Sequence, residues 1–204
     1  MTIARPHIEA TLLTVIAGIA DAVGYITMGG VFAANMTGNT VLAGIAAAES
    51  RYADAARHLM PLVAFFAGAM LARLMLRLWD RRSLPILVEI VLVAGLGFLP
   101  IGVEAQVMVL ALAMGLQAAA ITHFAGAAVS TVVVTSTLAR TAEAAVDRLW
   151  PGTGKSLPTV NMPSLLALSW TGYLVGAAAG AFLLKTIAWP LLVPAALLVL
   201  VILV

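Results

Sequence analysis

The chain has 204 residues, of which 63% are hydrophobic and 10% are charged, and its mean hydropathy is +1.09. Soluble domains are about 45–50% apolar and about 25% charged, and a chain of this length has too little interior to bury such an apolar surface. The composition therefore excludes a soluble enzyme and a disordered chain, and it predicts a polytopic membrane protein. The net charge is +2, and the basic residues are spread between apolar segments, so no nucleic-acid partner is expected.

Six segments are apolar for long enough to cross a bilayer, which takes about 20 residues as a helix. They lie at about 8–29, 58–79, 84–102, 105–125, 162–184 and 187–204. Two further stretches, at about 32–50 and 129–150, open with polar or β-branched residues and continue as a short apolar helical run. Such a run is typical of a re-entrant half-helix. The prediction is an all-α bundle of six spanning helices and two half-helices, in a single membrane domain over residues 1–204.

The distribution of basic residues favours this topology. With a cytoplasmic N-terminus and two re-entrant segments, eight Lys and Arg residues fall inside and three outside, in agreement with the positive-inside rule. If both short segments crossed the bilayer, the bias would reverse. Both termini are therefore expected in the cytoplasm.

The two halves of the chain, about 8–103 and 104–204, resemble each other. The string that begins at Gly18 aligns with the string that begins at Gly115, and the segment around Gly68 aligns with the segment around Gly176. Three crossings per half is an odd number, so the halves would be inserted upside down relative to one another. Inverted repeats with interrupted helices are a recurring architecture of secondary transporters.

The half-helices are predicted to begin inside the bilayer, near Met36–Thr37 and near Thr135. Free N–H groups and the helix dipole at such ends favour an anionic or hydrogen-bonding solute. The alternative is that the polar side chains only cap two short helices in a packed bundle. The candidate binding residues are Asn35, Thr37, Gly38, Asn39, Thr135, Ser136, Thr137 and Gln117.

Ionisable side chains inside apolar segments are candidates for coupling or gating. Asp21 lies near the middle of the first segment, where it could bind H⁺ or Na⁺ or hold the half-helix by hydrogen bonds, and Gln117 lies at a matching depth in the second half. Glu89 lies near the cytoplasmic start of its segment and is expected to pair with Arg77 or Arg81 or to reach water. His123, expected at the end of its helix, could relay a proton.

No enzyme or cofactor site is predicted. The chain lacks cysteine, and its three histidines lack the spacing of metal ligands. Gly154-Lys155-Ser156 resembles the end of a phosphate-binding loop, but Leu149 stands where that loop needs a glycine.

The string GIADAVGYITMGGVFAANMTGNTVLAG, together with VVVTSTLAR in the second half, resembles the YoaK-type family of bacterial membrane proteins, a family defined by a domain of unknown function. Its most specific parts are Ala20-Asp21-Ala22, Asn35–Asn39 and Thr135–Thr137. The resemblance covers essentially the whole chain and implies a multi-pass protein of the bacterial inner membrane. It implies no substrate.

The residues favour a small-solute transporter or permease, with a solute and H⁺ or Na⁺ as its ligands and the bilayer as its surroundings. The alternatives are a passive aquaporin-like pore and a non-transporting scaffold or assembly factor. Glycines at four-residue spacing (Gly172, Gly176 and Gly180) predict close helix contact, either within the chain or between two copies in a homodimer.

Overall fold

The computed structural model describes residues 5–120, 123–124, 127–128, 134–149 and 163–204. These residues form eight helices and one pair of two-residue strands, so the predicted all-α class is confirmed apart from this short pair. The elements are α1 (Arg5–Thr27), α2 (Met36–Ala48), α3 (Tyr52–Trp79), α4 (Ser83–Gly95), α5 (Val103–Ala120), β1 (His123–Phe124), β2 (Ala127–Ala128), α6 (Val134–Leu149), α7 (Pro163–Thr186) and α8 (Leu192–Leu203).

Four of the described helices are long and apolar enough to cross a membrane, namely α1, α3, α5 and α7. Helices α4 and α8 have 13 and 12 residues. At 1.5 Å per residue, each is about 20 Å long and shorter than the roughly 30 Å hydrocarbon core. The segment predicted at about 84–102 was expected to stay helical to residue 102, but α4 ends at Gly95 and is followed by Gly97 and Pro100. Glycine and proline at these positions favour the end of a helix.

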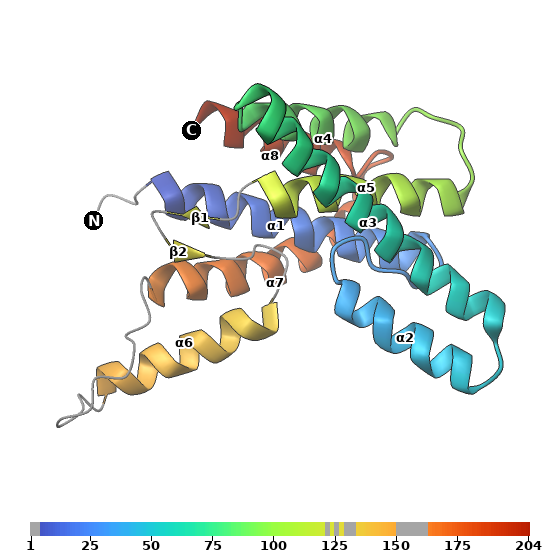
Figure 1. Cartoon of the computed structure of the whole chain (residues 1–204), viewed down its shortest axis with the longest axis horizontal. Helices are drawn as coiled ribbons and strands as arrows, with labels where there is room; N and C mark the ends of the chain where they lie inside the picture. The colour runs from blue at the N-terminus through green and yellow to red at the C-terminus, as the bar shows by residue number, and fades with distance from the viewer. Residues whose placement is uncertain (1–4, 121–122, 125–126, 129–133, 150–162) are drawn as a thin grey trace.

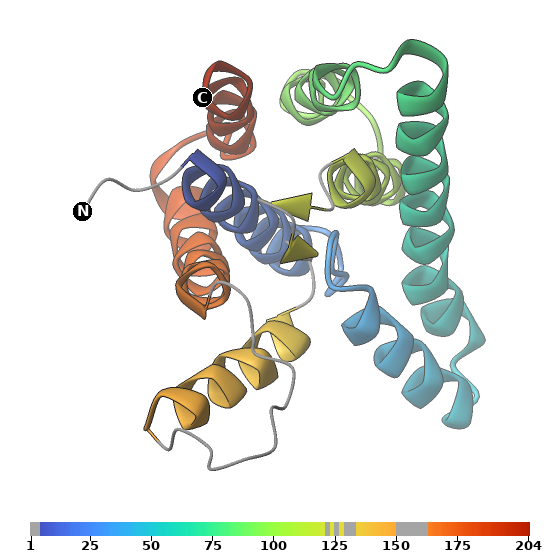
Figure 2. The ribbon, with the colours of Figure 1, turned by 60° about the vertical axis from the view of Figure 1, so that its left-hand side comes forward.

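The long helices pack in two pairs (Figures 1 and 2). Helix α1 lies along α7, and α3 lies along α5. The shorter helices are arranged in the same way around both pairs: α2 packs on α3 as α6 packs on α7, and α4 packs on α5 as α8 packs on α1. The core runs along α1 and α5, where Leu13, Ile16 and Leu110 are fully buried.

Glycines bring the helices of the α1–α7 pair into backbone contact. A Cβ atom on Gly18 would lie 2.2 Å from the carbonyl oxygen of Tyr173, and one on Gly176 would lie 2.2 Å from that of Val15. The glycine-rich face of α7 is therefore an internal seam of the bundle. The sequence left open whether these glycines make contact within the chain or between two copies, and in the structure they make contact within the chain.

The α3–α5 pair has the same construction. A Cβ atom on Gly68 would lie 2.1 Å from the carbonyl oxygen of Leu112, and one on Gly115 would lie 2.0 Å from that of Phe65. Small residues at such crossings allow two membrane helices to approach until their backbones touch.

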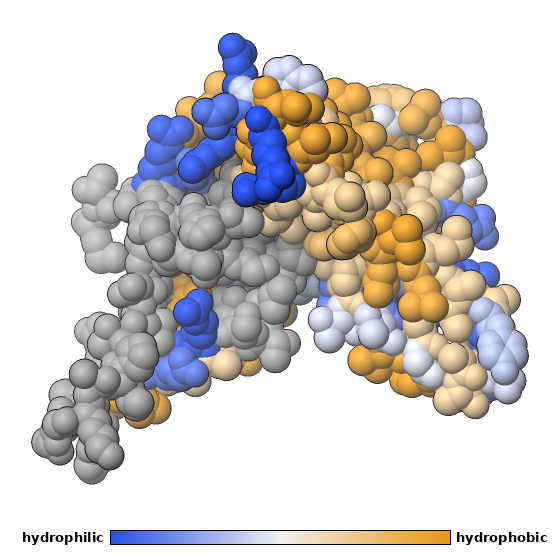
Figure 3. All heavy atoms as spheres, in the orientation of Figure 1, coloured by the Kyte–Doolittle hydropathy of each residue, from blue (hydrophilic) through white to orange (hydrophobic). Residues whose placement is uncertain are grey.

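The start of α1 and the end of α8 lie at the same end of the bundle (Figure 1). Hydrophilic side chains gather at the two ends of the molecule, and apolar side chains cover the surface between them (Figure 3). The exposed residues between α3 and α4, including Arg81 and Arg82, lie at the same end as the two termini. This surface suits a protein whose sides face lipid and whose ends face water.

Candidate functional site

The chain leaves the helical conformation between α1 and α2, as predicted. Helix α1 ends at Thr27, residues 28–35 form turns and bends, and α2 begins at Met36. Gly29 and Gly30 have φ angles of +77° and +76°, a region that other residues enter only with strain. The two glycines therefore allow the chain to turn back into the protein.

Asp21 holds this turn in place. Its side chain is 3% exposed, and its Oδ1 atom accepts hydrogen bonds from the N–H groups of Ala34 (2.6 Å) and Asn35 (3.2 Å). Its Oδ2 atom accepts a hydrogen bond from the hydroxyl of Tyr173 on α7. The carboxylate thus joins three elements: α1, the end of the loop and α7.

Two asparagines complete the loop. Asn39 is fully buried; its Oδ1 atom accepts from the N–H of Phe32 at 2.9 Å, and its Nδ2 atom donates to the carbonyl of Phe32 at 2.7 Å. Asn35 caps α2, with its Oδ1 atom accepting from the N–H of Gly38 at 3.1 Å. A Cβ atom on Gly38 would lie 2.9 Å from the ring of Phe32. These three predicted binding residues therefore shape the start of α2.

Helices α2 and α6 both begin about midway along the length of the bundle, on the same side of it, and in Figures 1 and 2 the start of α6 points toward the start of α2. Over the described residues the two helices do not pack on each other. In the first turns of α2, Thr37 is exposed, and the exposed Thr40 donates its hydroxyl to the carbonyl of Met36. Thr135, Ser136 and Thr137 belong to the first turn of α6, and their side chains lie outside the described part of the structure.

Gln117 lies apart from Asp21. Its Nε2 atom donates to the carbonyl of Leu13 at 3.0 Å. Leu13 precedes Asp21 by about 12 Å along α1, given a rise of 1.5 Å per residue. The Oε1 atom of Gln117 is buried and has no partner among the described residues. Gln117 thus links α5 to α1 and contributes nothing to the loop.

Glu89 on α4 differs from its prediction. It was expected to pair with Arg77 or Arg81 or to reach water, yet it is completely buried, and neither of its carboxyl oxygens has a partner among the described residues. Both arginines are exposed. A carboxylate charge buried without a partner is costly, so this group needs a proton or a cation at that position.

His123 also lies elsewhere than predicted. Helix α5 ends at Ala120, and His123 is in β1, where it pairs with Ala128 of β2. Its side chain lies outside the described part of the structure.

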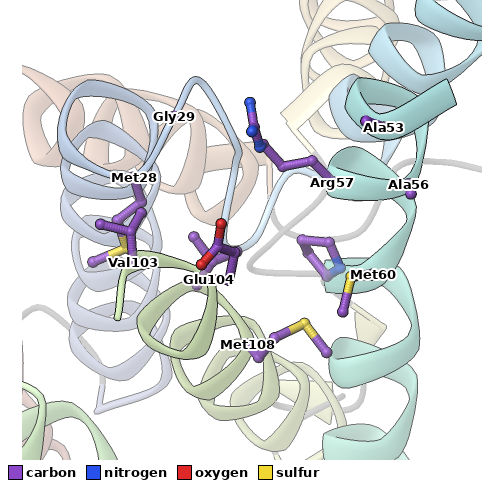
Figure 4. A pocket seen from close by; sticks show the side chains of 11 residues that line it. Met28, Gly29, Ala53, Ala56, Arg57, Met60, Val103, Glu104 and Met108 are labelled. Atoms are coloured by element: carbon purple, nitrogen blue, oxygen red, sulfur yellow. The ribbon is translucent and has the colours of Figure 1, made fainter. Parts of the chain in front are cut away.

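A cavity of about 430 Å³ opens where α1 ends and where α3 and α5 begin (Figure 4). The loop held by Asp21 forms part of its wall through Met28 and Gly29. Two oppositely charged residues, Arg57 on α3 and Glu104 on α5, also line it. The sequence analysis missed this cavity because these charges lie on different helices and have no local motif.

A second cavity, of about 360 Å³, lies at the opposite end of α1, near the two termini. The start of α4 lines it through Arg82, Ser83 and Ile86. Glu89 follows Ile86 by one helical turn and so lies deeper in the bundle on the same side of α4.

The comparisons with known proteins agree with this architecture. A family model described as "Protein of unknown function (DUF1275)" matches residues 10–204. The chain is 34% identical over 151 residues to the "UPF0700 transmembrane protein YoaK" of Bacillus subtilis (strain 168), a match that covers 69% of this chain and 67% of that protein. No solved structure matches.

Proposed function

We propose that this multi-pass membrane protein, which belongs to the DUF1275 family as its resemblance to the YoaK-type proteins predicted, is a permease that carries a small solute across the bilayer. The solute binds where α2 and α6 begin. The observation that carries the proposal is that the starts of both helices lie midway along the length of the bundle, on the same side of it, and face each other (Figures 1 and 2).

Helix starts inside a bilayer favour a particular kind of solute. The first N–H groups of a helix have no partner within that helix, and the dipole adds partial positive charge. Two such ends favour an anionic or strongly hydrogen-bonding solute. Thr37 contacts the solute from α2, and Thr135, Ser136 and Thr137 contact it from α6. Asn35, Gly38 and Asn39 act as positioning residues, because their contacts lie within the loop and the first turn of α2.

An inverted repeat accounts for the packing. Exchanging α1 with α5 and α3 with α7 turns one long-helix pair into the other, and the same exchange relates the packing of α2 to that of α6. The four seam glycines, Gly18, Gly68, Gly115 and Gly176, are the positions that the sequence alignment paired. This correspondence supports a 3+3 repeat with six crossings, in which α4 and α8 cross together with the loops beside them. The protein then lies in the bacterial inner membrane, with both termini in the cytoplasm.

The coupling role is divided between two acids. Asp21 accepts three hydrogen bonds, so it gates by holding the loop against α7. Glu89 has a buried carboxyl group that meets no partner among the residues that the structure describes, and it therefore binds the proton or Na⁺. The cavity one turn before Glu89 leads to the end of the bundle that carries the termini. His123 is a secondary candidate for the same proton path.

Uptake into proteoliposomes tests the permease. The purified chain is reconstituted, and accumulation of labelled inorganic phosphate, sulfate, acetate and lactate is followed with and without H⁺ and Na⁺ gradients. Thr37→Val removes one hydroxyl from the proposed site and is expected to lower uptake about tenfold, as the loss of one hydrogen bond to a charged solute does. Thr186→Val is the matched control, since Thr186 is an exposed helical threonine at the end of α7.

The outcomes separate the alternatives. Uptake against a concentration gradient supports a coupled permease, whereas uptake that stops at equal concentrations supports a passive pore. Equal uptake by the wild type, by Thr37→Val and by Asp21→Asn would exclude the proposed site. No uptake of any probe above that of empty liposomes would favour the scaffold.

A further inference from the structure

The cavity between the ends of α1, α3 and α5 has the properties of a binding site that is separate from the proposed transport site. Its volume of about 430 Å³ lies within the range of small-molecule sites in proteins, roughly 300–1,000 Å³. Figure 4 shows the side chains of Arg57, from α3, and Glu104, from α5, reaching toward the same space.

Arg57 and Glu104 line one cavity without joining each other. None of the ion pairs within 4.0 Å that are found among the described residues connects these two side chains. Arg57 has one long contact instead, 3.4 Å from its guanidinium to Asp54, and half of its side chain is exposed. A positive and a negative group therefore stand on different walls of an open volume, and a ligand that carries both charges could bridge them.

The rest of the lining is apolar and adaptable. Met28, Met60 and Met108 come from three different elements, and Val103 and Val107 add further apolar surface. Methionine side chains are flexible and polarizable, and they adapt to ligands of different shape. Such a wall accepts the apolar part of a ligand whose charged groups are held elsewhere.

We propose that this cavity binds a small zwitterion. Its carboxylate or phosphate pairs with Arg57, its ammonium group pairs with Glu104, and its apolar part contacts the methionines. Two sources share this chemistry: a free apolar amino acid, and the ethanolamine headgroup of a phospholipid. The proposal concerns binding and does not depend on transport. Either proposal, the zwitterion site or the permease, can therefore fail while the other remains valid.

Binding of single-charge probes tests each contact separately. The full chain in an uncharged detergent is titrated by calorimetry with L-leucine, with N-acetyl-L-leucine, which lacks the ammonium group, and with L-leucinamide, which lacks the carboxylate. L-leucine is expected to bind about tenfold more weakly to Arg57→Gln and to Glu104→Gln, as expected for the loss of one charged hydrogen bond. N-acetyl-L-leucine should respond only to Arg57→Gln, and L-leucinamide only to Glu104→Gln.

Arg51→Gln is the matched control, because Arg51 is exposed and paired with Glu49 and Asp54 but does not line the cavity. Arg57 and Glu104 are exposed, so thermal unfolding of both variants is expected to match the wild type. Dihexanoyl-phosphatidylethanolamine distinguishes the sources: if it binds with the same dependence on both residues and L-leucine does not, the ligand is a lipid headgroup. Failure of all four probes to bind, or affinities equal in the wild type and both cavity variants, would overturn the proposal.

Discussion

At Asp21, three hydrogen-bond donors from two distant parts of the chain meet one buried carboxylate. The sequence identified this residue, since an acid in the middle of an apolar segment is costly without a purpose. It did not identify Tyr173, which lies 152 residues away and whose hydroxyl donates to Oδ2. Only the packing of α7 along α1 brings the tyrosine to the acid.

The hydrogen bonds of Asp21 predict a measurable cost. Asp21→Asn replaces one acceptor by a donor that faces either Tyr173 or the loop N–H groups, and it is expected to lower the free energy of unfolding by about 1–3 kcal/mol. Tyr173→Phe should cost about 1–2 kcal/mol. The two changes should be less than additive in the double variant, because they remove a shared contact.

Denaturant unfolding in detergent measures these values. Tyr52→Phe is the control, since Tyr52 is 70% exposed and should tolerate the loss of its hydroxyl. Full additivity of the two changes would show that the contact between Asp21 and Tyr173 contributes nothing.

Glu89 leads to the opposite expectation for stability. A buried carboxyl group without partners destabilises the fold, so Glu89→Leu should raise the free energy of unfolding by about 1 kcal/mol or more. Glu89→Gln, which keeps a polar group at the same place, should gain less. If the proposed ion-binding role is correct, both variants lose gradient-driven uptake while they remain folded. Loss of stability in Glu89→Leu would indicate a partner for this carboxyl.

At the scale of elements, the sequence predicted the break after α1 and the start of α2 at Met36, and both are confirmed. The signals were local: a glycine pair for the turn and an asparagine for the cap. The lengths of α4 and α8 were harder to predict from the sequence, because the apolar composition continues past the helix ends and only glycine and proline interrupt it. His123 was assigned to α5 for the same reason, and α5 ends before it.

The glycine seams are testable by adding one methyl group. Gly18→Ala would place a Cβ atom 2.2 Å from the carbonyl of Tyr173, so α1 and α7 must separate. The expected cost is about 2–3 kcal/mol or more, as for overpacking in a dense core. Gly44→Ala on α2 is the control: a Cβ atom there meets nothing within 4 Å, and alanine should stabilise the helix by about 0.5–1 kcal/mol. Thermal unfolding of the two variants should therefore shift in opposite directions, and a neutral Gly18→Ala would contradict the close seam.

At the scale of the whole molecule, α1 packs along α7 and α3 packs along α5, and the starts of α2 and α6 face each other on one side of the bundle. The start of α1 and the end of α8 lie at one end of the bundle, and the start of α3 lies at the other (Figure 1). The two ends of the bundle can therefore be labelled separately, which allows the orientation of the protein in the membrane to be measured.

Cysteine labelling measures that orientation directly, because the chain contains no cysteine of its own. Tyr52→Cys, at the start of α3, should react with a membrane-impermeant maleimide on intact cells. Arg81→Cys, between α3 and α4, should react only after lysis. Both positions are exposed, so the difference reports the side of the membrane. The reverse pattern would invert the topology predicted from the positive-inside rule.

The sequence alone determined that this chain is a membrane protein, where its long helices lie, where the first helix breaks, and which acids lie inside apolar segments, where a charge is costly. These properties depend on composition and on local patterns of glycine, proline and polar residues. The tertiary structure decided which groups meet: Tyr173 lies at Asp21, the glycine seams lie inside the bundle, and Arg57 lies across a cavity from Glu104. It also buried Glu89 away from any partner within the described part of the chain. The physical reason is that lipid-exposed and protein-facing surfaces are equally apolar, so periodicity along a helix does not indicate its neighbours.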